Sequence, residues 1–192
     1  MRRTRSSVLL AVVALVASLT AVPAAAAPPV PVTFTILHTN DFHGQLEASG
    51  SNPGSAKVAT VVNGVRTTVG AANVLLVDAG DEMQGSLLSN LGDGTATGKG
   101  KPTIDVFNNM GYVAATFGNH EFDWGQENLA NRTTEATYPY VTANIVQNDT
   151  GNCATAGWTP PTFADAAYQI QTVETAPVVL TVTSARPTVR PL

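Results

Sequence analysis

The sequence is poor in charge, in basic residues and in cysteine. Of its 192 residues 12% are charged, and 10 Lys and Arg stand against 14 Asp and Glu, which gives a formal net charge of -4. Nucleic-acid binding depends on clustered Lys and Arg, so this balance argues against a nucleic acid as the partner. The single cysteine, Cys153, excludes an intramolecular disulfide framework and a cysteine-rich zinc module. The hydrophobic share of 44% is nevertheless that of a globular chain, and the length predicts one domain.

The N-terminus has the pattern of an export signal. Three arginines stand among the first five residues, an apolar run covers residues 8–19, and three alanines at 24–26 provide a cleavage pattern. The apolar run is shorter than the roughly 20 residues that a membrane-spanning helix needs. We therefore expect residues 1–26 to be a Sec-type signal peptide. The product would be extracellular or periplasmic, without a stable membrane span after cleavage.

Downstream of this signal, segments with a strand pattern alternate with segments with a helix pattern. β-branched and apolar runs predict strands at 31–38, 73–78, 113–117 and 138–146. Apolar spacing and helix start signals predict helices at 55–69, 102–110 and 126–133. Strands separated by helices are typical of a parallel or mixed sheet, so the predicted fold class is α/β.

Polar residues of one chemical kind follow three of the predicted strands. These groups are Asp41-Phe42-His43, Gly80-Asp81, and Gly118-Asn119-His120-Glu121 with Asp123. Ligands of such sheets gather beyond the carboxyl ends of the strands, and carboxylate, imidazole and amide oxygen all bind divalent metals. The two glycines are expected to let the backbone turn sharply. Each group alone is more commonly a turn, but three at successive strand ends predict a metal site.

These groups resemble the first three sequence blocks of the calcineurin-like metallophosphoesterases. Residues 36–44 and 118–123 are similar to the secreted branch that contains 5′-nucleotidases, UDP-sugar hydrolases and 2′,3′-cyclic phosphodiesterases, and so are residues 84–86 and 141–145. The resemblance runs from about Val32 to Tyr168. It implies the N-terminal half of an α/β sandwich and a hydrolase of nucleotides or other phosphate esters.

The resemblance also implies roles for individual residues. The family's activity uses two divalent ions, of which Zn, Mn, Mg and Ca are the candidates here, and a bridging hydroxide that attacks phosphorus. By this resemblance Asp81 would bridge the ions, Asp41 and His43 would complete one of them, and Asn119 would bind the other. The native metal and the oligomeric state stay open.

Two further residues would act on the leaving group. The resemblance assigns His120 as a proton donor or a stabiliser of developing charge, and Asp123 would orient its imidazole. Asp123 has an alternative role as the N-cap of the following helix. His38 matches no ligand position. Asp78 and Glu82 flank the site, either in support of it or as solvated side chains.

The family pattern continues with histidines that this sequence lacks. A further His and a Gly-His-x-His block would supply the remaining ligands, but no histidine follows His120. Residues 181–192 are rich in Thr, Arg and Pro without a strand or helix pattern. We therefore expect a partial metallophosphoesterase domain at 27–180 and an atypical, disordered tail at 181–192, from a truncated or frame-shifted gene. The alternative function is that of a non-catalytic fragment with at most weak metal binding.

Overall fold

The structure is a computed structural model, and it describes residues 31–145, 161, 163–166, 169–173 and 176–180. The helices and strands of these residues all belong to the unit Val32–Leu192. The predicted signal peptide at 1–26, Cys153 and the predicted tail at 181–192 lie outside the described residues. In the described part of the chain, no helix is long and apolar enough to span a bilayer.

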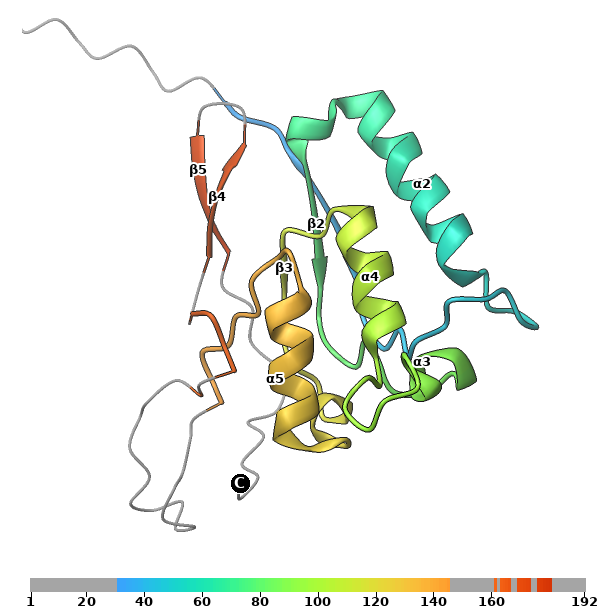
Figure 1. Cartoon of the computed structure of the whole chain (residues 1–192). Coiled ribbons are helices and arrows are strands. Elements are labelled where there is room, and N and C mark those ends of the chain that lie inside the picture. The colour runs from blue at the N-terminus through green and yellow to red at the C-terminus, as the bar shows by residue number, and fades with distance from the viewer. Residues whose placement is uncertain (1–30, 146–160, 162, 167–168, 174–175, 181–192) are drawn as a thin grey trace, which may run out of the picture. The chain divides into compact units, whose positions relative to one another are not determined.

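Three parallel strands form the sheet that carries the site (Figure 1). They are β1 (Thr35–Thr39), β2 (Val74–Asp78) and β3 (Ala114–Ala115), in the order β1-β2-β3. The almost continuously apolar sequence of β2 is typical of a strand covered on both faces, and four of its five residues are buried. The α/β prediction with a parallel sheet is confirmed.

Within the described residues, four α-helices and two short 3-10 helices lie between or after the strands of this sheet. They are α2 (Gly54–Val69), α3 (Leu87–Leu91), α4 (Lys101–Met110), α5 (Gly125–Glu135), η1 (Ala71–Asn73) and η2 (His120–Phe122). The three predicted helices are confirmed within two residues at each end. Pro102 lies in the first turn of α4, and Gly111 ends that helix in the left-handed region, at φ 71°. The sequence analysis did not predict α3, whose N-cap Ser86 accepts a hydrogen bond from the Ser89 N–H.

The later strands are shorter than predicted. Ala115 is paired with Asp78, the last residue of β2, so the β2–β3 ladder ends there. Of the segment predicted as a strand at 138–146, the described residues up to Ile145 form isolated parallel bridges, from Tyr140 to Ala115 and from Val141 to Ala166. The N–H of Tyr140 donates to the side-chain carboxylate of Asp165 and therefore takes no part in strand pairing. An antiparallel pair that was not predicted, β4 (Gln169–Val173) and β5 (Ala176–Leu180), follows.

The main core lies between the sheet and the helices. Its members include Leu76 of β2, Val62 of α2, Ile104 and Phe107 of α4, and Leu129 of α5. Figure 1 shows these helices beside the strands that they cover. A smaller cluster, formed by Leu75, Ala114 and Val141, covers the opposite face of the sheet. Side chains alternate between these two faces along a strand, which explains why Leu75 and Leu76 belong to different clusters.

An aromatic stack connects this core to the first polar loop. The ring of Phe107 is stacked on that of Tyr112 with centroids 4.1 Å apart, and it meets the ring of Phe42 edge-on at 5.2 Å. Phe42 stands between Asp41 and His43 in the sequence. Packing of its ring therefore fixes the loop that carries both of these predicted ligands.

We expect Phe107→Ala to lower the free energy of unfolding by about 3–5 kcal/mol, because Phe107 is fully buried and its removal leaves a cavity under the Phe42 ring. Urea unfolding followed by circular dichroism measures this loss. Val61→Ala is the control, since Val61 is 64% exposed and its truncation should cost less than about 0.5 kcal/mol. Equal losses in the two variants would contradict this account of the core.

Candidate metal centre

Backbone hydrogen bonds join the loop after β1 to the loop after β2. The N–H of Asp41 donates to the carbonyl oxygen of Gly80 at 3.0 Å, and the N–H of His43 donates to that of Asp81 at 2.9 Å. These bonds continue the pairing of the two strands beyond their ends. The two loops therefore hold their polar residues at a fixed spacing.

The backbone is strained at three of the predicted metal ligands. Among the residues that the structure describes, only Asp41, His43 and Asp81 are non-glycine residues with positive φ, at 50°, 51° and 56°. This region costs an L-residue about 1 kcal/mol or more, and such residues cluster at functional sites because the surrounding structure holds them there. The loops thus hold these three residues in conformations that an isolated chain would avoid.

Side chains tie the loop after β3 to the loop after β2. The N–H of His120 donates to Oδ1 of Asp81 at 2.8 Å. The buried carboxylate of Glu121 accepts from the N–H groups of Gly118 at 2.7 Å, of Asp81 at 2.8 Å and of Glu82 at 2.8 Å. All three strand-end loops are therefore connected to one another.

Gly80 and Gly118 in these loops are required for different structural reasons. Gly80 adopts φ 97°, which confirms the predicted sharp turn. Gly118 does not have positive φ, and the chain bends at the next residue, Asn119, before η2 begins at His120. A side chain at this position would not fit, because a Cβ atom added to Gly118 would overlap the side chain and the N–H of Asp81.

His43, Asp81 and His120 form a cluster that could hold a cation. One ligand atom from each of them lies within 4.8 Å of the others, and all three are half-buried. Nδ1 of His43 lies 2.7 Å from the carbonyl oxygen of Gln84, which can only accept, so Nδ1 carries the hydrogen and Nε2 is left to bind metal. Two imidazoles and a carboxylate suit a divalent cation of intermediate hardness.

The remaining predicted site residues lie around this cluster. Asp41 is outside the cluster, is exposed, and accepts a hydrogen bond from Nδ2 of Asn40 at 2.6 Å. Asn119 is exposed at the N-cap of η2. Asp123 is the C-cap of η2, whereas the N-cap of α5 is Trp124, so the alternative role of Asp123 as a helix N-cap is wrong. The ligand roles of Asp41 and Asn119 stay predictions.

His120 and Asp123 form an ion pair at the edge of the cluster. Nδ1 of His120 lies 2.6 Å from Oδ2 of Asp123, and the two side chains are 35% and 30% exposed. The hydrogen bond to Asp123 raises the pKa of His120, and the nearby Asp81 and Glu121 carboxylates add to this. The predicted orienting contact is present, while the catalytic roles of both residues stay predictions.

Two acidic residues that flank Asp81 are buried, so the expectation that they could be solvated is wrong. Burial raises the pKa of Asp78 to about 8, against the hydrogen bonds from the Thr39 hydroxyl and the Gly80 N–H. Burial and the neighbouring Asp78 raise the pKa of Glu82 well above its usual range, and the Tyr140 hydroxyl donates to Glu82 at 2.7 Å. A polar layer thus lies directly beneath the loops.

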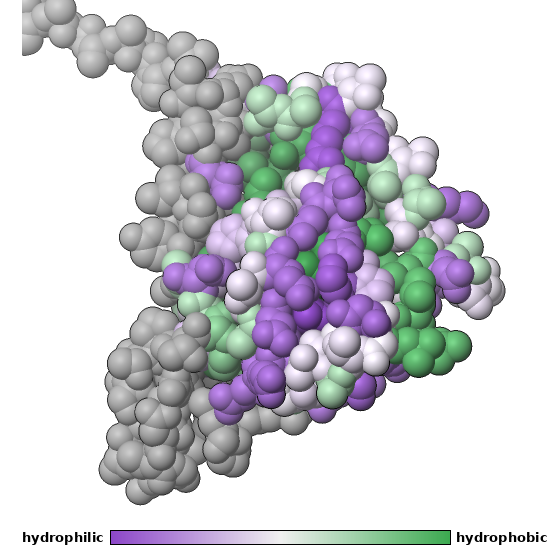
Figure 2. All heavy atoms as spheres, in the orientation of Figure 1, coloured by the Kyte–Doolittle hydropathy of each residue, from purple (hydrophilic) through white to green (hydrophobic). Residues whose placement is uncertain are grey.

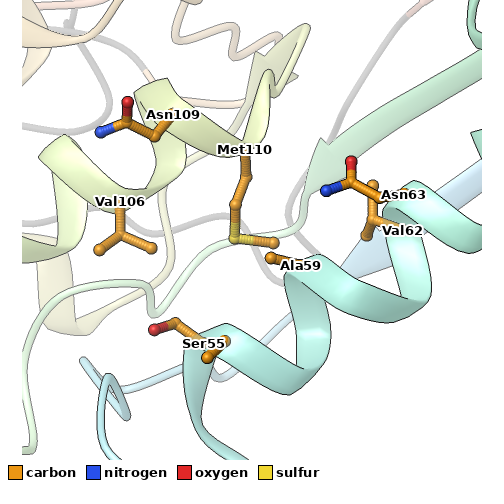
Figure 3. Close-up of a pocket in the computed structure, with 8 residues that line it drawn as sticks. Ser55, Ala59, Val62, Asn63, Val106, Asn109 and Met110 are labelled. Carbon is orange, nitrogen blue, oxygen red and sulfur yellow. The ribbon is translucent and has the colours of Figure 1, made fainter.

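A separate groove of about 200 Å³ lies between α2 and α4 (Figure 3). Met110 of α4 reaches toward Ala59 of α2, with Ser55, Asn63 and Asn109 at the rim. None of the predicted site residues lines this groove. It is therefore not part of the candidate metal centre.

Parallel strands whose terminal loops gather imidazole and carboxylate ligands define an α/β protein with a candidate metal site. The family model for calcineurin-like phosphoesterase matches residues 34–173. The chain belongs to this family, which confirms the resemblance read from the strand-end motifs.

The curated relatives are nucleotidases and nucleotide phosphodiesterases. A bovine (Bos taurus) 5′-nucleotidase is 36% identical over 127 residues, which cover 60% of this chain and 21% of that protein. A 2′,3′-cyclic-nucleotide 2′-phosphodiesterase/3′-nucleotidase from Haemophilus influenzae is 34% identical over 128 residues, which cover 62% and 19%. The chain thus spans about a fifth of the length of these relatives.

Solved structures of the family share the fold. The calcineurin-like phosphoesterase YfkN from Bacillus subtilis matches with a TM-score of 0.59 and 27% identity, over 77% of this chain and 46% of that chain. The NAD nucleotidase of Haemophilus influenzae matches with a TM-score of 0.58 and 26% identity, over 78% and 26%. The matched part of this chain therefore corresponds to less than half of each of these two solved chains.

We expect Gly118→Ala to weaken Mn²⁺ binding at least about tenfold, because the added methyl would displace the carboxylate of Asp81. Isothermal titration of the chain with Mn²⁺ measures this change. Gly64→Ala is the matched control: Gly64 lies within α2, and its added methyl meets nothing within 4 Å. Unchanged binding in Gly118→Ala would contradict the argument.

We expect the free energy of unfolding, measured with chelator present, to fall as the pH rises from about 4 to about 8. The pKa of Asp78 is about 8 in the folded chain against an ordinary 3.8, so the folded state binds more protons across this window. Asp78→Asn should make this slope shallower, as followed by urea unfolding at several pH values. Glu127→Gln, a change of an exposed acid on α5, should leave the slope as it is. An equal slope in wild type and Asp78→Asn would refute the assignment.

Proposed function

We propose that this chain carries the N-terminal half of the metallophosphoesterase sandwich of a metal-dependent phosphate-ester hydrolase that acts on nucleotides, in the manner of a 5′-nucleotidase. The observation that carries the proposal is the cluster of His43, Asp81 and His120, held by loops that are strained at the predicted ligands. The names of the curated relatives support nucleotides as the substrate class.

Carboxylate, imidazole and amide oxygen are donors that suit divalent ions, and the family resemblance implies two such ions. Asp81 would lie between them, Asp41 and His43 would serve one of them, and Asn119 would serve the other. When bound, such ions lower the pKa of a water molecule and neutralise the charge of a phosphate ester. The backbone bonds between the loops after β1 and β2 would keep Asp41 and His43 close to Asp81.

His120 would act on the leaving group of the ester. Its Nδ1 is engaged by Asp123, which leaves Nε2 as the nitrogen that can donate to an oxygen of the substrate. Asp123 favours the charged imidazole, which can give a proton or a strong hydrogen bond to the departing oxygen. The half-exposed position of both side chains leaves room for a substrate to approach.

We also propose that the protein acts outside the cytoplasm after removal of residues 1–26. The support is the sequence pattern alone: early arginines, a short apolar run and an alanine-rich cleavage pattern.

The second candidate function is that of a fragment that binds metal weakly and does not catalyse. The number of ligands favours it: the cluster in the described residues offers three ligand atoms, whereas zinc and calcium sites take four to eight. Asp41 could raise that number, but its carboxylate does not belong to the cluster.

We expect the chain to release phosphate from a nucleoside 5′-monophosphate when Mn²⁺ or Zn²⁺ is added, and to stop when EDTA is added. Asp81→Ala should lower the rate by roughly 100-fold or more because it removes the bridging carboxylate. Glu127→Gln, on the exposed side of α5, is the control and should keep the wild-type rate.

The outcomes separate the two candidate functions. Phosphate release that is lost in Asp81→Ala supports the hydrolase. A wild-type chain that binds Mn²⁺ in a titration but releases no phosphate supports the fragment. Release that survives Asp81→Ala would point to a contaminating phosphatase and would count against the proposed site.

A further inference from the structure

We propose that Glu121 is a positioning residue, whose carboxylate holds the loops after β2 and β3 at the spacing that the metal centre requires. Its effect on metal binding rests on the proposed function, whereas its effect on the two loops does not. Glu121 lies in η2 directly after His120, and its side chain turns away from the cluster toward the backbone of both loops.

Three N–H groups from two separate parts of the chain converge on this one carboxylate. Oε2 accepts from Gly118 at 2.7 Å and from Asp81 at 2.8 Å, and Oε1 accepts from Glu82 at 2.8 Å. Asp81 and Gly118 belong to the loops after β2 and β3, so Oε2 alone bridges the two loops. Glu121 is only 2% exposed, so water has little access to replace these bonds if the carboxylate is removed.

The chemistry of the site requires a carboxylate at this position. An ionised carboxylate only accepts hydrogen bonds and has two oxygens with about four lone-pair positions, which suits three convergent donors. A glutamine of the same shape offers one oxygen, and its amide hydrogens would face one of the three N–H groups. The change from Glu to Gln therefore sets an NH2 group against at least one of the three N–H groups, with little change in side-chain volume.

The position of Asp81 depends on this arrangement. Its backbone is held at φ 56° while its N–H donates to Glu121, and its Oδ1 accepts from the N–H of His120. Glu121 and His120 are adjacent in the chain, so the same short helix holds both the N–H and the carboxylate of Asp81. If the hydrogen bond between the Asp81 N–H and Glu121 is lost, the carboxylate of Asp81 and the imidazole of His120 are no longer held at a fixed separation.

Amide hydrogen exchange of the full 192-residue chain, measured by NMR without metal, tests the positioning role. In wild type the N–H groups of Asp81, Glu82 and Gly118 should exchange slowly. In Glu121→Gln at least one of the three should exchange at least about tenfold faster relative to other protected amides, because one side-chain oxygen is replaced by an NH2 group. Glu127→Gln makes the same chemical change on the exposed side of α5 and should leave these three amides unchanged. Equal exchange in wild type and Glu121→Gln would overturn the proposal.

Mn²⁺ titration tests the consequence for the metal centre. We expect Glu121→Gln to weaken Mn²⁺ binding about 10- to 100-fold, as changes behind metal ligands do. Leu129→Ala is the control for a merely structural effect, because Leu129 is a fully buried core residue of α5 that makes none of these hydrogen bonds. It should lower the melting temperature while Mn²⁺ affinity stays near that of wild type. Wild-type affinity in Glu121→Gln would contradict the proposed role in the metal centre.

Two results keep this test separate from that of the proposed function. If wild type binds no Mn²⁺, the proposed metal centre fails, and the exchange rates still decide the role of Glu121. If Glu121→Gln does not fold, the exchange rates of the wild-type amides test the positioning role of Glu121. Exchange of the Asp81 and Gly118 N–H groups at the rate of unprotected amides would overturn the proposal, and slow exchange would support it.

Discussion

The hydrogen bonds that connect the loops after β1, β2 and β3 are the constraint on which the rest of the site depends. Backbone bonds join Asp41 and His43 to the loop after β2, and the side chain of Glu121 joins that loop to the one after β3. These bonds hold strained backbone at Asp41, His43 and Asp81, which a less connected loop would release. The cluster of ligands exists because the loops cannot separate.

The core and the polar layer support these loops from below. Phe42, which stands between the predicted ligands Asp41 and His43 in the sequence, packs against Phe107 of α4. Packing of the helices on the sheet therefore also stabilises the loop after β1. Burial of Asp78 and Glu82 beneath the loops favours their neutral forms, which limits the negative charge next to the candidate metal centre. Leu87, Leu88 and Leu91 of α3 are exposed to solvent. Figure 2 shows hydrophobic residues on the molecular surface at the position of this helix.

The sequence was sufficient to predict the α/β class, the three longest helices and the gathering of polar residues at three strand ends, since apolar periodicity and parallel topology determine these. It was not sufficient for the pairing of the segment around Tyr140, because the side chain of Asp165 accepts from the Tyr140 N–H and no local pattern reveals that contact. The same holds for Glu121: its place in a motif was visible, but the direction of its side chain depends on two loops distant in the sequence. Gly118 was predicted to serve a turn, but the close approach of Asp81, which also requires a glycine there, could not be seen in the sequence.

The most direct test of the central claim is a crystal structure of the chain grown with Mn²⁺, with anomalous diffraction used to locate the metal. The account predicts an anomalous peak within bonding distance of Nε2 of His43 and a carboxylate oxygen of Asp81, with His120 beside it and Glu121 still bonded to the Asp81 and Gly118 amides. Mn²⁺ bound only at other places, with the three loops ordered and the cluster without a peak, would contradict it.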